Sequence, residues 1–367
     1  MGNYRVAVYA ISKNEAAFAR RWAESMAEAD RLYVLDTGSE DDTVALLEEA
    51  GVTVWQERIS PWRFDSARNA VLSRLPEDCE ICVCTDLDEV FTPGWRDAVE
   101  RAWEQGSTRL RYRYVWNYLP GGQEGTVFWI DKIHARHGYC WQNAVHEILV
   151  RTDSAPERYR TVTGMTLQHH ADPTKSRGSY LPLLELSVAE DPENDRNMHY
   201  LGREYLFYQR YEDCIRTLLR HLALPRATWD AERSASMRYI ARAYEALGNR
   251  GEAIRWLLRA AAEAPLLREA YVELAFLYFR EENWAGVLFA CQSALRIRER
   301  PAIYINEPMA WGALPYDLAS LAWYHLGNPA EALAAAETAL RLSPADTRIA
   351  QNLQFFQHLM PNEERSG

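Results

Sequence analysis

The chain has 367 residues, 48% of them hydrophobic, which is enough for two domains that each bury a core. Its formal net charge is -11 and its arginines are scattered, so strong sequence-independent binding to nucleic acid or anionic lipid is disfavoured. No apolar run reaches the length of a membrane span, and the N-terminus lacks the basic start and apolar core of a secretory signal. These features predict a cytoplasmic protein with no membrane span.

Up to about residue 167, short β-rich runs alternate with helical runs, which is the pattern of an α/β layer. The expected elements, in chain order, are strand 4–11, helix 15–29, strand 32–35, helix 41–50, strand 52–55, helix 66–75 and strand 81–85. Because the connections are short, we expect a mainly parallel sheet between helices, with ligands beyond the carboxyl ends of its strands. Asp36 and Asp86 each follow a strand directly, so we expect both at that edge.

From residue 197 onward the pattern is helical and repeats. Small residues recur where two helices would cross closely, with tyrosine or tryptophan beside them. Four copies of a helix pair align on these positions: Gly202 and Tyr205, Ala241 and Tyr244, Ala275 and Tyr278, Ser320 and Trp323. The middle copies match the tetratricopeptide pattern and predict a helical-repeat solenoid.

The division between the two patterns predicts the domain organisation. We expect an α/β domain over 1–180, a linker over 181–195 and an all-α repeat domain over 196–367, whose last helix, 347–360, is polar and caps the solenoid. A Pro-rich insertion, RPAIYINEPMAWGALPY, precedes the fourth copy of the repeat. Its length and aromatic residues make it a candidate binding loop.

The stretch CTDLDEVF places three carboxylates, Asp86, Asp88 and Glu89, directly after an apolar strand. Burying them without a partner would carry a large desolvation cost, so a cation is expected nearby. Hard oxygen ligands suit Mg²⁺ or Mn²⁺, which often share their coordination with phosphate oxygens of a substrate. The alternative is a solvated turn ahead of the next helix.

The motifs VAVYAISKNEA, VLDTGSEDDT, FDSARN and TDLDE follow one another in this order. Together they resemble the nucleotide-sugar-binding half of family-two glycosyltransferases of the GT-A fold, and nearly the whole chain resembles the subgroup with tetratricopeptide repeats after the transferase domain. The resemblance implies a GT-A domain followed by a solenoid. It also implies an inverting, hexosyltransferase-type enzyme that depends on Mn²⁺ or Mg²⁺ and uses a nucleotide-sugar donor, usually a UDP-sugar.

The resemblance implies a nucleotide site at the first two strands. Asp36 would accept a hydrogen bond from the uracil N3–H, although an Asx-type turn or helix cap would also explain this aspartate. Arg68 would reach the base or the diphosphate, the alternative being a surface helix arginine. Ile11, Ser12 and Glu15 would line the nucleoside pocket, while Glu15 could instead favour the N-terminus of the next helix.

The resemblance also implies a metal site. Asp88 would be a direct ligand, and Asp86 would contact the ribose or a metal-bound water, with Glu89 ranked below both. His169 fits the place of a third ligand better than His170 does, and the alternative for either is a buried, hydrogen-bonded histidine.

Four further residues complete the implied site. Glu147 is the candidate general base in a segment ending in Val-His-Glu, and His146 could instead supply the base or a ligand. If that segment is extended, the two side chains must point to opposite faces. Lys175 and Arg177 could close over the diphosphate, or they could be solvated linker charges.

The sequence thus predicts a transferase whose helical repeats select a peptide, protein or other large acceptor, with dimerisation as a second role for the repeats. The competing class is a non-catalytic tetratricopeptide scaffold with a vestigial transferase domain. A glycosyltransferase acting on hydroxylated bases of phage DNA is a further alternative, and the acidic net charge weakens it.

Overall fold

The computed structural model describes residues 4–104, 106–172 and 178–359. The chain forms two compact units, one of Met1–Glu190 with Ala302–Tyr304 and the other of Asp191–Pro301 with Ile305–Gly367. None of the helices in these described ranges combines the length and the apolar character that a membrane span requires.

The first unit is an α/β domain. Its strands are β1 (Val6–Ser12), β2 (Arg31–Asp36), β3 (Thr53–Gln56), β4 (Ile81–Cys84), β5 (Glu89–Phe91), β6 (Arg109–Val115), β7 (Val127–Ala135), β8 (Tyr139–Gln142), β9 (Ile148–Arg151) and β10 (Tyr159–His169). Its helices are α1 (Ala16–Met26), α2 (Thr43–Glu49), α3 (Phe64–Arg74), α4 (Trp95–Trp103) and α5 (Tyr180–Glu190).

Over the described residues, eight strands form one sheet in the order β3-β2-β1-β4-β7-β6-β10-β5, and β8 pairs with β9 separately. The first four strands are parallel, as the sequence predicts. The other half is mixed, because β7 is antiparallel to both β4 and β6, and β5 is antiparallel to β10. Strand β10 is parallel to β6, so only β7 and β5 run against the other six strands, and the prediction of a mainly parallel sheet is correct for the described strands.

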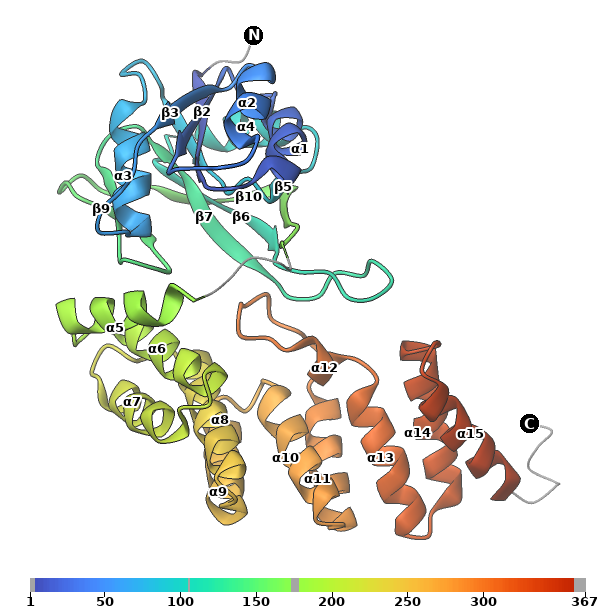
Figure 1. Cartoon of the computed structure of the whole chain (residues 1–367). Coiled ribbons are helices and arrows are strands. Elements are labelled where there is room, and N and C mark those ends of the chain that lie inside the picture. Colours follow the sequence, from blue (N-terminus) through green and yellow to red (C-terminus); the bar gives the residue numbers. More distant parts are fainter. Residues whose placement is uncertain (1–3, 105, 173–177, 360–367) are drawn as a thin grey trace. The chain divides into compact units, whose positions relative to one another are not determined.

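Strand β1 is buried on both faces. Val6, Val8 and Ala10 pack on one face with Trp22 of α1 and Trp95 of α4. The alternate residues of β1 pack on the other face with α3 and the β8–β9 hairpin. The side-chain period of two in a strand covered on both faces explains the unbroken apolar run. Figure 1 shows α1, α2 and α4 gathered on one side of the sheet and α3 on the other.

A chain of buried hydrogen bonds crosses this core. The indole N–H of Trp141 donates to the Tyr9 hydroxyl at 2.9 Å, and that hydroxyl lies 2.7 Å from Nε2 of His134. Nδ1 of His134 lies 2.8 Å from the backbone oxygen of Ala135, so Nδ1 carries the proton and Nε2 accepts. Burial lowers the pKa of His134 to about 3, and the imidazole is neutral at pH 7.

The protein is therefore expected to lose stability in mild acid. In the unfolded chain this histidine has a pKa of 6.5 and is protonated below that pH. In the folded protein, His134 is protonated only below about pH 3, so acid favours the unfolded chain. The loss grows as pH falls from 6.5 and reaches about 2–3 kcal/mol at pH 4.5. Urea denaturation of wild type and His134→Gln at pH 7.5 and 4.5 measures it. Equal losses in both proteins would assign the acid sensitivity to other groups.

The second unit is a series of helix pairs. Its helices are α6 (Asp195–Phe207), α7 (Tyr211–Ala223), α8 (Asp230–Ala246), α9 (Arg250–Glu263), α10 (Glu269–Arg280), α11 (Trp284–Arg296), α12 (Pro308–Trp311), α13 (Leu314–His325), α14 (Pro329–Leu342) and α15 (Thr347–Leu359). Pairs α6–α7, α8–α9, α10–α11 and α13–α14 follow one another and each packs on the next (Figure 1). The predicted tetratricopeptide-like repeat is confirmed.

Two details at the ends of this unit refine the prediction. Helix α15 packs on α14 as the last helix of the series, and Phe356 is buried against Ala332 and Ala336. Residues 181–190, predicted as part of a linker, instead continue helix α5, and α6 begins at Asp195. Within the predicted linker, residues 191–194 are the part that connects these two helices.

Helices α6 and α7 cross at Gly202. A methyl group at this position would overlap the fully buried side chain of Leu218. Close helix crossings require the smallest residue at such a point, which is why the repeat alignment has a small residue there.

Gly202→Ala is expected to destabilise the protein by about 1–3 kcal/mol, because the added methyl group overpacks the crossing. Gly251→Ala in α9 is the matched control, since the nearest atom to its Cβ would lie 4.0 Å away. That substitution should be neutral or stabilise the helix by up to about 1 kcal/mol. Thermal unfolding followed by circular dichroism separates the two. A Gly202→Ala protein as stable as wild type would show that Leu218 can move aside.

Candidate functional site

Three acidic residues lie at the carboxyl end of β4. Asp86 and Asp88 lie in the short connection that follows this strand, and Glu89 begins β5. Strand β10 runs antiparallel to β5, and its last residue, His169, pairs in register with Glu89. This register brings the imidazole to Asp88, although the two residues are far apart in the sequence.

Asp88 and His169 face one another. Nε2 of His169 lies 3.3 Å from Oδ2 of Asp88. Nδ1 of the same ring lies 2.8 Å from the backbone oxygen of Trp116, and the ring stacks on the Trp116 indole. Burial alone would lower the pKa of His169, but the Asp88 carboxylate and the Trp116 carbonyl outweigh it and raise the pKa. The backbone N–H of His170 donates to the Asp88 carbonyl, while its ring stacks on Tyr118.

Asp86 is held by two cations. Its Oδ1 accepts from Nη2 of Arg68 at 2.6 Å, and its Oδ2 lies 3.2 Å from Nζ of Lys132. Burial would raise the pKa of Asp86, but the two cations outweigh it and hold the pKa well below its usual range. Both carboxylate oxygens are therefore engaged, and the role predicted for Asp86 at a ribose or a metal stays a prediction.

Glu89 holds the connection between β4 and β5, which carries Asp86 and Asp88. Its Oε2 accepts from the backbone N–H of Asp86 at 2.9 Å, and its Oε1 accepts from the Tyr114 hydroxyl at 2.7 Å. Nζ of Lys132 lies 3.5 Å from the same Oε1. Burial raises the pKa of Glu89. This carboxylate holds the backbone that presents the two aspartates.

Arg68 is buried, with 4% of its side chain exposed, so the alternative of a surface arginine is wrong. Its Nε donates to Oε1 of Glu147 at 2.5 Å, and its guanidinium lies over the Trp141 ring. Together with the contact to Asp86, this makes Arg68 a bridge between two carboxylates. The role predicted for Arg68 at a base or diphosphate stays a prediction.

Glu147 and His146 lie in the bend between β8 and β9. The segment is not extended at this point, because His146 has a φ of 52° and Asn143 a φ of 82°. The His146 ring packs edge-on against Tyr180 of α5, with 5.7 Å between ring centroids. Glu147 turns instead toward Arg68. The backbone turn, rather than strand alternation, separates the two side chains.

Asp36 anchors the turn after β2. Its oxygens accept hydrogen bonds from the Ser12 hydroxyl at 2.9 Å and from the backbone N–H groups of Gly38 and Ser39 at 3.0 and 2.9 Å. The Ser39 hydroxyl contacts the same carboxylate. These contacts are those of the Asx-type turn that the sequence allows. The contact of Asp36 with a nucleobase stays a prediction.

The remaining predicted residues are placed as follows. Ile11 packs in the core on the α3 side, and Ser12 ends β1. Glu15 precedes α1 directly, as its N-cap residue, which is the alternative that the sequence allows. Lys175 and Arg177 lie outside the described residues.

Asp86, Asp88, Glu89 and Glu147 form what we call the acidic cluster. Sequence reasoning missed three residues that contact it or cover it: Lys132, Tyr114 and Trp116. Lys132 lies on β7, whereas Tyr114 and Trp116 lie at the end of β6 and just beyond it. The local signal is weak, because β7 reads VFWIDKIHA and Lys132 follows another charged residue, Asp131, in the same strand. Their contribution depends on the antiparallel pairing of β6 and β7 in the mixed half of the sheet.

The arrangement of Asp88 and His169 fits a divalent cation. The hydrogen bond from Nδ1 to a backbone carbonyl fixes the tautomer whose Nε2 carries a lone pair, as is usual for metal-binding histidines. The carboxylate suits Mg²⁺ or Mn²⁺, and the imidazole nitrogen favours a transition metal such as Mn²⁺ over Mg²⁺. Four carboxylates, Asp86, Asp88, Glu89 and Glu147, lie around the cationic side chains of Arg68 and Lys132, so carboxylates outnumber these two cations in the cluster.

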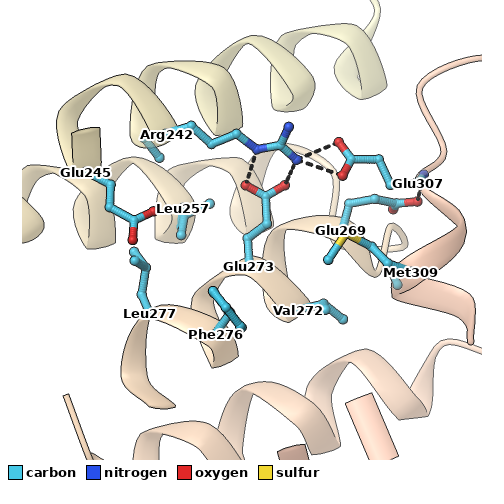
Figure 2. Close-up of a pocket in the computed structure, with 12 residues that line it drawn as sticks. Arg242, Glu245, Leu257, Glu269, Val272, Glu273, Phe276, Leu277, Glu307 and Met309 are labelled. Atoms are coloured by element: carbon cyan, nitrogen blue, oxygen red, sulfur yellow. Dashed lines mark hydrogen bonds and ion pairs between the residues drawn. The ribbon is translucent and has the colours of Figure 1, made fainter. Parts of the chain in front are cut away.

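The second unit has a pocket of about 300 Å³ in which acidic side chains surround an arginine (Figure 2). Arg242 of α8 donates from Nε and Nη2 to the carboxylate of Glu273 of α10, at 3.0 and 2.8 Å. Nη2 of Arg242 also donates to Glu307 at 2.6 Å, and Arg238 donates to the same carboxylate at 2.7 Å. The apolar part of the lining consists of Ala241, Leu257, Val272, Phe276, Leu277, Met309 and Ala310.

Glu307, Met309 and Ala310 belong to the predicted binding loop, the Pro-rich insertion. The backbone N–H of Glu307 and the indole N–H of Trp311 both donate to Oε1 of Glu269, at 3.1 and 2.9 Å. The insertion is thus held on the α8–α10 surface by ion pairs and hydrogen bonds, and it forms one wall of the pocket.

No protein-family model matches the chain. Among solved structures, the chain is similar to a crystal structure of MamA, with 19% identity and a TM-score of 0.38 over 47% of this chain and 91% of that chain. It is similar to PilF of Pseudomonas aeruginosa, with 16% identity and a TM-score of 0.37 over 49% and 72%. It is also similar to TTC0263, a tetratricopeptide protein of Thermus thermophilus, with 16% identity and a TM-score of 0.35 over 48% and 89%. Identities and TM-scores this low say nothing about what this chain binds or does.

Proposed function

We propose that the first unit is a metal-dependent, inverting glycosyltransferase domain that uses a nucleotide-sugar donor, in the first instance a UDP-sugar. The observation that carries the proposal is the convergence of Asp88 and His169 beside Asp86 at the carboxyl edge of the parallel strands. Ligands of open α/β sheets bind at this edge. A domain with a purely structural role would have no use for an excess of negative charge there.

Asp88 and His169 are the residues that would hold Mn²⁺ or Mg²⁺ in the proposed site. Such an ion, when bound, offsets the negative charge that develops on the departing diphosphate. Lys132 pairs with Asp86 and Glu89 and adds a cation to the cluster. Trp116 covers the His169 ring, which keeps the imidazole in one orientation.

Glu147 is the proposed general base. In an inverting transfer, the acceptor oxygen bonds to the anomeric carbon from the face opposite the diphosphate, whose bond to that carbon breaks. The acceptor proton passes to the base. Arg68 contacts both Glu147 and Asp86, so it holds the carboxylate of Glu147 near the other acidic residues of the cluster. His146 packs against Tyr180 and is the weaker candidate.

Calorimetric titration of UDP in the presence and absence of Mn²⁺ tests the proposal, together with a hydrolysis panel of UDP-sugars. Metal-dependent binding of UDP and turnover of at least one UDP-sugar are the expected results. If the wild type neither binds UDP nor turns over any nucleotide sugar with metal present, the chain is a scaffold with a vestigial transferase domain.

The second candidate function is binding of a peptide, a protein or another large acceptor by the helical repeats. The pocket under the Pro-rich insertion favours it, because the pocket combines apolar walls with paired charges on a repeat surface. Within the proposed transferase, this surface would select the acceptor. Without transferase activity, it would be the main binding surface of the protein.

The ion pairs of Glu307 are expected to hold the insertion closed over the pocket. Glu307→Gln should raise amide hydrogen exchange in residues 305–311 by about tenfold or more, because two arginines lose a charged partner. Glu299→Gln is the matched control, since Glu299 is exposed in the same connection. Hydrogen-exchange mass spectrometry measures both. Unchanged exchange in Glu307→Gln would show that the hydrogen bonds to Glu269 hold the insertion without the ion pairs.

A further inference from the structure

Three potential metal ligands meet inside the second unit, whereas the acidic cluster belongs to the first. His199 comes from α6, His221 from α7 and Glu232 from α8. One ligand atom of each lies within 4.8 Å of the others, and all three residues are buried. Three successive helices therefore each contribute one ligand to the same buried point.

The two imidazoles are oriented alike by one hydroxyl. Oγ of Ser236 lies 2.7 Å from Nδ1 of His199 and 3.0 Å from Nδ1 of His221. A hydroxyl oxygen has two lone pairs and can accept from both Nδ1–H groups. In that arrangement both Nε2 atoms carry lone pairs. Metal-binding histidines are held in this way, by a hydrogen bond from the other ring nitrogen.

The Nε2 atoms of His199 and His221 also point to a ligand. Within the described part of the chain, neither Nε2 has a hydrogen-bond partner, although His199 is 0% exposed and His221 is 1% exposed. Buried polar atoms in folded proteins are nearly always satisfied, so two such atoms on neighbouring rings, whose centroids lie 5.5 Å apart, call for a ligand.

The spacing suits zinc. Zinc binds imidazole nitrogen at about 2.0–2.1 Å and carboxylate oxygen at about 2.0–2.2 Å, so tetrahedral ligand atoms lie about 3.4 Å apart. Nε2 of His221 lies 3.5 Å from Oε1 of Glu232. Two nearby guanidinium groups, Arg196 and Arg203, act on His199 and oppose a further cation, so a moderate affinity is expected.

We propose that His199, His221 and Glu232 form a structural zinc site that joins the first helix pair of the repeat unit to the second. A water molecule would take the fourth position. The site does not depend on transferase activity, because its ligands lie in the repeat unit.

The test uses full-length protein prepared without a histidine tag. The protein also carries Asp88→Ala, so that metal bound at the acidic cluster does not contribute to the measured zinc content. After incubation with zinc and dialysis, elemental analysis should find about one zinc per chain. Zinc should raise the unfolding temperature by several degrees, and EDTA should reverse the shift. In place of zinc, Co²⁺ should give the visible absorption bands of a tetrahedral site.

His221→Gln and Glu232→Gln are the ligand variants, and each should lose the bound zinc and the thermal shift. Glu232→Gln keeps the side-chain shape, so it remains informative where His221→Gln fails to fold. His325→Gln, at the end of α13, is the control histidine and should keep both. A wild-type chain in the same background that retains no zinc and shows no shift would overturn the proposal, as would zinc retained equally by both ligand variants.

Discussion

Replacing Asp88 with asparagine is expected to reduce metal-dependent turnover of the UDP-sugar by about a thousandfold, while the fold stays intact. Asp88 is the only one of the four clustered carboxylates that faces His169 in the described contacts. An amide in its place keeps the size and shape of the side chain but removes the charge that a divalent cation needs. Steady-state hydrolysis of the UDP-sugar across a Mn²⁺ titration measures the effect.

Asp97→Asn is the matched control, because Asp97 is an exposed carboxylate in the first turn of α4. It should leave the turnover and the Mn²⁺ dependence unchanged. Restoration of Asp88→Asn activity at high Mn²⁺ would place the defect in metal affinity alone. Full activity of Asp88→Asn at every Mn²⁺ concentration would contradict the proposed metal site.

The position of Asp86 and Asp88 was predictable from the sequence, because parallel strands determine the edge of the sheet at which these residues lie. Asp86 and Asp88 follow an apolar strand, and the carboxyl ends of parallel strands share one edge, so their position needs only local pattern and chirality. Lys132 was not predictable in the same way. It reaches Asp86 through the antiparallel pairing of β4 with β7, and no local signal announces that register.

Other parts of the candidate site depend on backbone geometry that residue types do not reveal. The bend at His146 has a positive φ without a glycine, so the residue types did not indicate that a turn separates the side chains of His146 and Glu147. In the second unit, the small residues at helix crossings predicted the repeat. The ligands of the proposed zinc site come from three helices, with no spacing that matches a metal-binding motif.

Replacing Arg68 with methionine is expected to destabilise the protein by about 3–5 kcal/mol. The substitution removes the shared partner of Asp86 and Glu147 and leaves the Glu147 carboxylate, which is 11% exposed, without its cation. Arg74→Met is the control on the same helix. Its partner, Glu57, is 41% exposed, so that ion pair should contribute less than about 1 kcal/mol. Urea denaturation at pH 8 measures both.

The loss in Arg68→Met should become smaller as pH falls. The pKa of Asp86 is held below 3.8 in the wild type, so the stabilisation from its pairing is present above that value and lost as pH falls through the lowered pKa. The variant lacks the contribution of Arg68 to this pairing, although Lys132 still faces Asp86, so it has less stabilisation to lose over the same pH range. The double variant Arg68→Met with Glu147→Gln should recover about 1–3 kcal/mol relative to the single variant, because it removes the stranded charge. Strictly additive losses at pH 8 would show that Arg68 stabilises the core through its contact with Trp141 rather than through the two carboxylates.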